Sequence, residues 1–306
     1  MLTDDAFIKA LQTGTSAEIE QFIIKGANVN DADINGLTPL VIAGVHNPNA
    51  EAVDILLQYG ANMNATDTEG HSAILYICDA CSNPAVIDVL LKYGFKVNSR
   101  HIDGATPLMW AAANNPSVEF LKALLAKGAF VHDKDVYGGT ALMWAASATN
   151  NPEIVKALIE AGSSLTEREK RGDFTPTIFA AKDNPEKAVL ETLVNAGANV
   201  FEKSPKGVNL LMFAAFSNPN PEIALYLMEK GIDVNAKDFE GYTALMYAAA
   251  ANPSAEVFNL LLNAGADTTA VNAQGQTAFD LAKNNPNLNV DFYNPDDNIN
   301  TDVRKQ

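Results

Sequence analysis

The sequence predicts an all-α fold in which short helix pairs stack as the repeats of a solenoid. Three observations lead to this prediction. Short apolar segments that begin at Thr, Ser or Asn recur at start positions 38, 72, 106, 140, 175, 209, 243 and 277. The spacing is 34 residues except for one step of 35, and from each of the first seven start positions a glycine follows 22 residues later. A fixed period of this length, with apolar residues at helical spacing, is the signature of a helical repeat array.

The chain begins with a degenerate repeat. Gly26 lies 22 residues after Asp4, so the register extends back to the N-terminus, although no proline follows the start position there. The terminal repeats of a solenoid need a polar outer face. We therefore expect the first helix pair to act as a polar N-terminal cap.

The repeat that starts at Thr106 shows the expected layout most clearly. Thr106 can cap a helix with its hydroxyl, and Pro107 suits the first helical turn. The first helix is predicted over 108–113 and the second over 118–126, where Phe and Leu recur at helical spacing. Gly128 then ends the second helix, as a residue in the left-handed conformation commonly does. One such pair cannot bury its apolar face alone, so successive pairs must stack.

These residues resemble the ankyrin repeat. The resemblance rests on Thr-Pro-Leu-x-x-Ala-Ala at 106–112, on second helices such as 153–158, and on Gly-Ala-Asn-Val-Asn at 26–30. It covers residues 3–285. It implies two antiparallel helices and a protruding hairpin-like loop in each repeat, with protein–protein binding as the usual activity.

The resemblance divides the chain into an ankyrin-repeat domain over 1–286 and an irregular tail over 287–306. The domain comprises a degenerate N-terminal cap, seven full repeats from about position 36 and a partial repeat from about 275, of which only the first helix is evident. The tail is rich in Asn, Asp and Pro. Its apolar residues, Val290, Phe292 and Tyr293, leave open whether it docks on the last repeat.

Two departures from the ankyrin pattern matter. The His that commonly follows Thr-Pro-Leu is replaced by an apolar residue, so we expect apolar packing in place of hydrogen bonds between repeats through that His. The Gly between the helices is replaced by a longer loop with Asn-Pro, a style that resembles bacterial ankyrin proteins more than eukaryotic ones. Asn is a good N-cap and Pro suits the first helical position, so each pair is predicted to begin the second helix. The pairs are Asn47-Pro48, Asn83-Pro84, Asn115-Pro116, Asn151-Pro152, Asn184-Pro185, Asn218-Pro219 and Asn252-Pro253.

Composition argues against several classes of partner. The net charge is −16, from 37 acidic and 21 basic residues. Phosphate backbones and anionic membranes attract Lys and Arg, so neither nucleic acid nor a membrane surface is expected as the main partner. No apolar run reaches the roughly 18 residues of a membrane span. The start of the chain lacks the basic and apolar regions of a signal peptide, which predicts a cytoplasmic protein unless an export signal has been removed.

No catalytic, cofactor or metal site is expected. Cys78 and Cys81 form a C-x-x-C motif, but no strand pattern precedes it, as a redox motif would require. We interpret Cys78 as a small core residue and Cys81 as a semi-exposed thiol. A zinc site needs two further ligands, and His71 is the sole other candidate in that repeat. The histidines pair with no recognisable nucleophile, and the sequence holds no phosphate loop or nucleophile elbow.

The surface that the resemblance indicates is a concave groove, lined by hairpin tips and one face of each first helix. Residues four, seven and eight positions after each start position share that face. The fourth position holds six consecutive aromatic residues flanked mainly by small ones, which would leave slots between the rings. Packing of the rings between neighbouring helices would explain the same pattern. Packing and partner binding are compatible if one edge of each ring is packed and one face is open. This aromatic series consists of Tyr76, Trp110, Trp144, Phe179, Phe213 and Tyr247.

The hairpin tips add further candidate contacts. Tyr137, Phe239 and Tyr242 are large apolar side chains in loops, where they are costly to expose without a partner. A basic stretch stands out against the acidic background and includes two tip residues and one residue of the groove floor. The alternative is a set of solvated charges interleaved with nearby acids. The basic candidates are Arg171, Lys182 and Lys206.

The sequence thus predicts a protein-interaction module, an adaptor, scaffold or inhibitor that is monomeric on its own and binds a protein or an extended peptide in the groove. No enzyme activity is expected. Two alternatives stay open, namely an enzyme with an unrecognised site and a passive structural spacer. A spacer predicts a polar, featureless groove, in contrast to the aromatic series.

Overall fold

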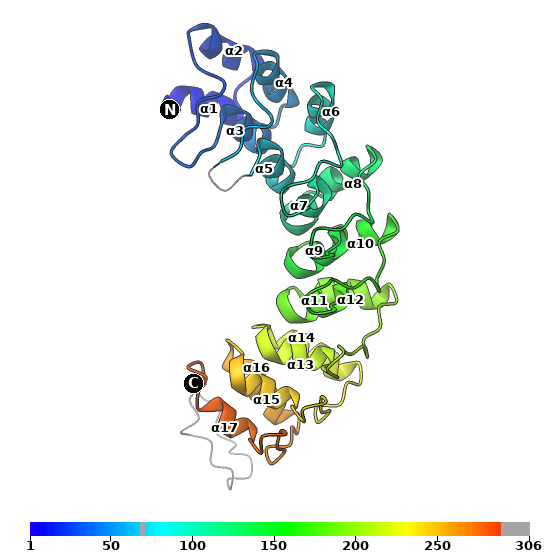
Figure 1. The fold of residues 1–306 in the computed structure, drawn as a ribbon. Helices are drawn as coiled ribbons and strands as arrows, with labels where there is room; N and C mark the ends of the chain where they lie inside the picture. Colours follow the sequence, from blue (N-terminus) through cyan, green and yellow to red (C-terminus); the bar gives the residue numbers. More distant parts are fainter. Residues whose placement is uncertain (68–70, 289–306) are drawn as a thin grey trace. The chain divides into compact units, whose positions relative to one another are not determined.

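A computed structural model describes residues 1–67 and 71–288 of the chain. These residues form seventeen α-helices and no strand, apart from isolated bridges between Thr66 and Ser72 and between Lys203 and Asn209 (Figure 1). Helices alternate along the chain as a first and a second member of each repeat. The prediction of an all-α array of helix pairs is therefore confirmed. Among the described helices, none is both long and apolar enough to cross a membrane.

The helices are short and fall at the predicted period. The first helices are α1 (Asp5–Thr13), α3 (Pro39–His46), α5 (Ala73–Ala80), α7 (Pro107–Asn114), α9 (Ala141–Ala148), α11 (Pro176–Asp183), α13 (Leu210–Ser217), α15 (Ala244–Ala251) and α17 (Ala278–Ala282). The second helices are α2 (Ser16–Ile24), α4 (Ala50–Gln58), α6 (Ala85–Lys92), α8 (Val118–Ala126), α10 (Pro152–Glu160), α12 (Lys187–Asn195), α14 (Pro221–Glu229) and α16 (Ala255–Asn263). Of the tail predicted over 287–306, the part from 289 onward lies outside the described residues.

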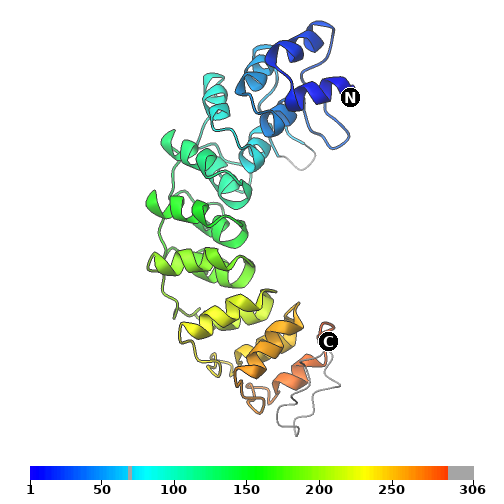
Figure 2. The same ribbon diagram turned by 180° about the vertical axis from the view of Figure 1, so that it is seen from behind.

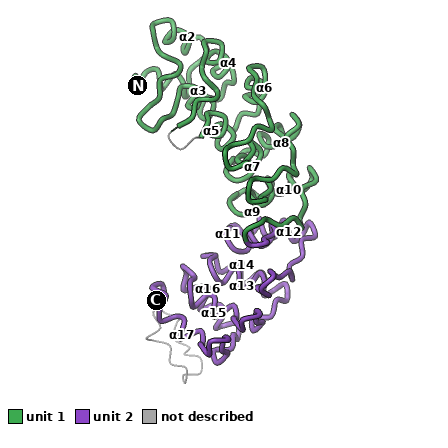
Figure 3. The backbone as a smooth tube through the Cα atoms, in the orientation of Figure 1, with its two compact units in different colours: residues 1–171 green, residues 172–306 purple. Residues whose placement is uncertain are grey.

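Contacts divide the chain into two compact units, Met1–Arg171 and Gly172–Gln306 (Figure 3). In the first unit, α1, α3, α5, α7 and α9 pack in series, and the second helices α2, α4 and α6 do the same. In the second unit, α11, α13, α15 and α17 pack in series beside α12, α14 and α16. Figure 1 and the reverse view in Figure 2 show the first helices of each unit as one layer and the second helices as another. The apolar core lies between these layers.

Local signals explain where the helices begin and end. The hydroxyl of Thr106 accepts a hydrogen bond from the backbone N–H of Met109 at 3.4 Å, which caps α7. At the N-terminus, a carboxylate oxygen of Asp4 accepts from two backbone N–H groups at the start of α1. Gly128, at a φ of 90°, follows α8 in the left-handed region that favours glycine. The Thr106 cap and the glycine after α8 are therefore used as predicted.

The Asn-Pro loops differ from the prediction in most repeats. Asn151 does cap α10, with Pro152 at its first position. In five other repeats the Asn ends the first helix instead of beginning the second, and its side chain is buried. These C-terminal caps are Asn47, Asn115, Asn184, Asn218 and Asn252.

The reason for this difference is hydrogen bonding between repeats. The side-chain N–H₂ of Asn115 donates to the carbonyl oxygens of Cys78 and Cys81, both at 2.9 Å and both in the preceding repeat. Its Oδ1 accepts from the backbone N–H of Ser117 at 2.8 Å. The last carbonyls of a helix lack partners within the helix, and one amide here satisfies two of them. Hydrogen bonding between repeats is thus supplied by this Asn, at a different position from the His that the sequence lacks.

Candidate functional site

Hairpin loops connect one repeat to the next and meet along one edge of each compact unit. In the first unit, the backbone N–H of Val136 donates to the carbonyl of Asp103 at 2.9 Å. In the second unit, the backbone N–H of Phe239 donates to the carbonyl of Lys206 at 3.1 Å. These bonds hold neighbouring tips in a defined order, so side chains at the tips form a row beside the first helices of the same unit.

The aromatic series lies on the first helices as predicted from the register, with one residue in each repeat. Tyr76, Trp110 and Trp144 belong to α5, α7 and α9 of the first unit, and all three are half-buried. In the second unit Phe179 and Tyr247 are half-buried, whereas Phe213 is only 9% exposed. Each ring except Phe213 is therefore partly accessible to solvent.

Half of the aromatic series is fixed by a carboxylate from the preceding hairpin. In each case the acceptor lies nine residues before the ring and the donor is the polar edge of the ring. The three bonds run from Tyr76 Oη to Asp67 Oδ2 at 2.6 Å, from Trp144 Nε1 to Asp135 Oδ2 at 2.9 Å, and from Tyr247 Oη to Asp238 Oδ2 at 2.7 Å.

Asp135 shows how one carboxylate organises both hairpin and ring. It is 9% exposed, and its other oxygen accepts from the backbone N–H groups of Tyr137 and Gly139 at 2.9 and 2.7 Å. The same arrangement around Asp238 affects Tyr247, because burial and the adjacent carboxylate raise the pKa of this phenol. The rings are therefore held in one orientation before any partner arrives. An Asp nine residues before a Tyr or Trp recurs in the sequence, and this spacing is the signal that could have indicated these bonds.

Trp110 has a different environment because His101 occupies the position of these aspartates. The ring centroids of Trp110 and Trp144 are 5.8 Å apart, and His71 approaches Trp110 edge-on at 5.5 Å. His71 in turn stacks on His101 at 5.7 Å. Within residues 1–67 and 71–288, the buried Nε1 of Trp110 has no hydrogen-bond partner.

Exposed apolar side chains gather at the hairpin tips. Ile102 is 91% exposed and Phe239 is 80% exposed. Tyr137 is 43% exposed, and the guanidinium of Arg171 lies 3.2 Å from its ring centroid. Tyr242 is half-buried against Tyr247, with 5.4 Å between ring centroids. The tips thus combine apolar surface with aromatic rings that are already packed on one side.

The predicted basic residues fall in different units and have different partners. Arg171 belongs to the first unit and stacks on Tyr137. Lys182 and Lys206 belong to the second unit. The ammonium of Lys182 bonds to Asp183 at 2.6 Å, which fits the alternative of interleaved charges for this residue. Lys206 is exposed and forms no ion pair within the described part of the chain.

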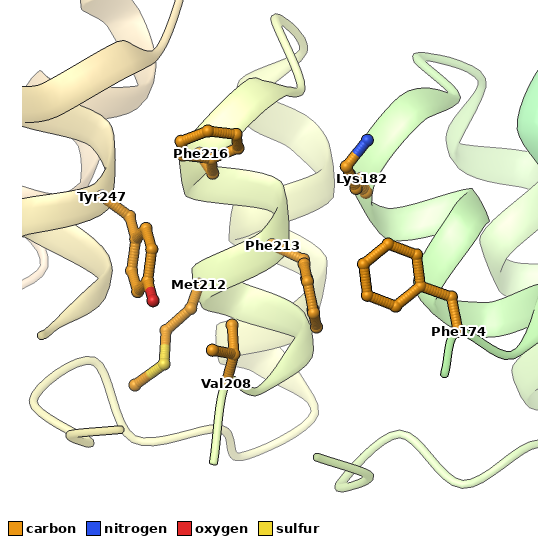
Figure 4. A pocket seen from close by; sticks show the side chains of 7 residues that line it. All are labelled: Phe174, Lys182, Val208, Met212, Phe213, Phe216 and Tyr247. Atoms are coloured by element: carbon orange, nitrogen blue, oxygen red, sulfur yellow. The ribbon is translucent and has the colours of Figure 1, made fainter. Parts of the chain in front are cut away.

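A pocket of about 190 Å³ opens between the first helices of the second unit (Figure 4). Phe213 and Met212 come from α13, with Tyr247 of α15 on one side and Phe174, just before α11, on the other. Phe216 and Lys182 complete the lining together with Val208 of the preceding hairpin. Four of the lining side chains are aromatic, so the pocket differs from a slot between one ring and small neighbours.

Family models for ankyrin repeats match most of the chain. The model described as "Ankyrin repeats (3 copies)" matches residues 7–101 and 77–169, and the model described as "Ankyrin repeats (many copies)" matches 193–248 and 227–282. The chain belongs to the ankyrin-repeat family. No match was found among curated proteins. Ankyrin repeats are in general protein–protein interaction modules.

In this ankyrin-repeat chain the C-x-x-C motif lies in the core. Cys78 and Cys81 are each 1% exposed, so the expectation of a semi-exposed thiol at Cys81 was wrong. Burial raises the pKa of Cys81 to about 11 and that of Cys78 further still. Cys81 occupies the register position that Asn115 holds in the next repeat, which explains its burial. Among the described residues, no cluster of His, Cys, Asp and Glu could hold a metal ion.

Proposed function

We propose that this ankyrin-repeat chain is an adaptor, scaffold or inhibitor that binds a protein or an extended peptide. The contact surface comprises the open faces of the first helices and the hairpin tips beside them. The observation that supports the proposal most strongly is the presence of exposed apolar side chains at the hairpin tips, next to half-buried rings of the aromatic series. Single exposed apolar residues are ordinary, but exposed apolar tips beside partly accessible rings in the same unit favour an interaction surface.

The ring geometry also favours binding. A partner gains most where a large aromatic side chain is already held in place, because less conformational freedom is lost on association. Tyr76, Trp144 and Tyr247 are held in this way by their aspartates. A passive spacer would have no use for pinned, half-open rings, so this observation favours an interaction surface.

The residues assigned to this surface lie on the first helices or in the hairpins beside them. Phe213 is buried, at 9% exposure, whereas the other residues of the set are half-buried or exposed. The proposed contact residues are Tyr76, Trp110, Trp144, Phe179, Phe213, Tyr247, Tyr137, Phe239, Tyr242, Arg171, Lys182 and Lys206.

Selection of peptides tests the proposal directly on the purified chain. A displayed random peptide library is selected on the immobilised chain, and the affinities of enriched peptides are measured for purified variants. Ile102→Ser and Phe239→Ser remove exposed apolar tips and should leave folding intact. Lys156→Glu on α10 is the control, since it alters an exposed second-helix side chain.

We expect at least one tip variant to bind each enriched peptide several-fold more weakly, with circular dichroism unchanged. The control should bind as the original chain does. Enrichment only of peptides that tolerate both tip variants and lose binding with Lys156→Glu would contradict the proposal.

A further inference from the structure

We propose that the pocket of the second unit takes one aromatic side chain from an extended peptide whose neighbouring residues are acidic. This inference rests on the proposed protein-binding function and names the chemistry of the segment that would be bound. Three features carry it, namely the size of the pocket, its lining and the charges beside it.

The pocket has the size of a single ring. An apolar protein cavity of about 150 Å³ is large enough to take up benzene, and this pocket measures about 190 Å³. Its floor is built by buried side chains, with Met212 at 1%, Val208 at 7% and Phe213 at 9% exposure. Phe216, at 40% exposure, stands at the entrance. A phenyl or phenol side chain can therefore enter without displacing the core.

The lining favours an aromatic occupant over an aliphatic one. The rings of Phe174 and Phe213 meet edge-on, with centroids 5.2 Å apart. On the other side Phe216 and Tyr247 are also perpendicular, at 6.0 Å. A ring inserted between these pairs meets both edges and faces of other rings, the arrangements that aromatic side chains prefer.

The charges beside the pocket attract carboxylates. Lys203 and Lys206 lie on the hairpin that leads to Val208, and both are exposed without an ion pair in the described part of the chain. Lys182 lines the pocket itself and forms an ion pair with Asp183.

The acids on the flanking hairpins restrict where a carboxylate can sit. Glu202 already accepts a hydrogen bond from Thr175 at 2.6 Å, and Asp238 accepts one from Tyr247. Glu240, on the next tip, is exposed. Partner carboxylates are thus favoured next to Lys203 and Lys206 and disfavoured next to Glu240.

Fluorescence anisotropy with designed peptides tests the inference on the full chain. The probe is a labelled Gly/Ser peptide that carries one Phe next to two Asp residues. Two comparison peptides replace the Phe with Ala or both Asp with Lys. We expect the Ala peptide to bind about tenfold more weakly or worse, because a buried Phe side chain contributes at least that much. The Lys peptide should also bind more weakly, mainly at low ionic strength.

Variants of the chain locate the binding. Val208→Phe should fill the pocket and abolish binding of the probe. Lys203→Glu with Lys206→Glu should weaken it about two- to fivefold at low ionic strength and less at high ionic strength. Lys230→Glu, an exposed change of the same sign at the end of α14, should have no effect. Thermal unfolding of each variant shows whether the fold persists, and the charge variants decide the question if Val208→Phe unfolds.

Several outcomes would overturn the inference. They are no binding of the probe, equal binding of the Ala peptide, or binding that survives in a folded Val208→Phe variant. A tenfold rise in affinity on removing residues 289–306 would assign the pocket to the chain's own C-terminal segment and also overturn it. If library peptides bind through the tips while the Phe-Asp probe fails, the general binding function stands and only the pocket assignment falls.

Discussion

The indole Nε1 of Trp144 donates a hydrogen bond of 2.9 Å to Oδ2 of Asp135, which lies nine residues earlier in the hairpin that precedes α9. The bond links a tip to the first helix beside it. Since Asp135 also accepts from two backbone N–H groups, the position of the ring and the shape of the hairpin depend on the same carboxylate.

Replacing this carboxylate should destabilise the repeat more than altering the ring. Asp135→Ala leaves three donors without their acceptor and should lower the free energy of unfolding by about 2 kcal/mol or more. Trp144→Phe removes a single donor and keeps the aromatic packing, so its effect should be smaller. Chemical denaturation measures both, and an equal or reversed order would show that the hairpin does not depend on Asp135.

The buried side-chain amide of Asn115, which links two repeats, should contribute more to the free energy of unfolding than the exposed amide of Asn114. Asn115→Ala leaves the carbonyls of Cys78 and Cys81 without their donor and should cost about 2–4 kcal/mol. Asn114→Ala, next to it in sequence but exposed, should cost about 0.5 kcal/mol or less. Similar values from urea denaturation would mean that water replaces the buried amide without penalty.

Removing a buried core side chain should lower the free energy of unfolding more than removing a helix cap. Leu124 is fully buried, so Leu124→Ala should cost roughly 2–5 kcal/mol. Thr106→Ala removes one capping bond and should cost about 1 kcal/mol. If denaturation gave the larger loss for Thr106→Ala, the assignment of the α8 face to the core would be wrong.

The buried thiols should make stability depend on alkaline pH. An unfolded thiol has a pKa of about 8.5, whereas burial raises the pKa of Cys81 to about 11. Above the lower value the unfolded state loses protons that the folded state retains, so the free energy of unfolding should fall as the pH rises past about 8.5. A Cys78→Ala, Cys81→Asn variant should show a shallower fall. Denaturation at a series of pH values compares the two, and parallel curves would contradict the prediction.

The aromatic series should contribute to binding of a library-selected peptide. Trp110→Ala with Trp144→Ala should lower affinity several-fold or more, because large rings concentrate binding energy. Arg171→Glu with Lys206→Glu should weaken binding mostly at low ionic strength. Circular dichroism checks that each variant is folded. Intact binding by both, with loss in Lys156→Glu, would place the contact on the second helices.

Much of the fold could be predicted from the sequence, because its signals are local. The period, the caps such as Thr106 and the glycines such as Gly128 each act within a few residues, and they set where helices begin and end. The positions of the aromatic series on the first helices followed from the same register. These local signals do not determine how much of each ring the next repeat buries.

Only the tertiary structure decided the features that depend on a neighbouring repeat. By local preference Asn115 could cap either helix. Its hydrogen bonds to two carbonyls of the preceding repeat place it at the end of the first helix. Cys81 is buried because it occupies that same inter-repeat position. Phe213 is covered where the other rings stay half-open, and the pocket beside it exists because Phe174, Phe213 and Tyr247 come from three successive repeats. Burial and cavities arise from packing between repeats, which a single repeat sequence does not contain.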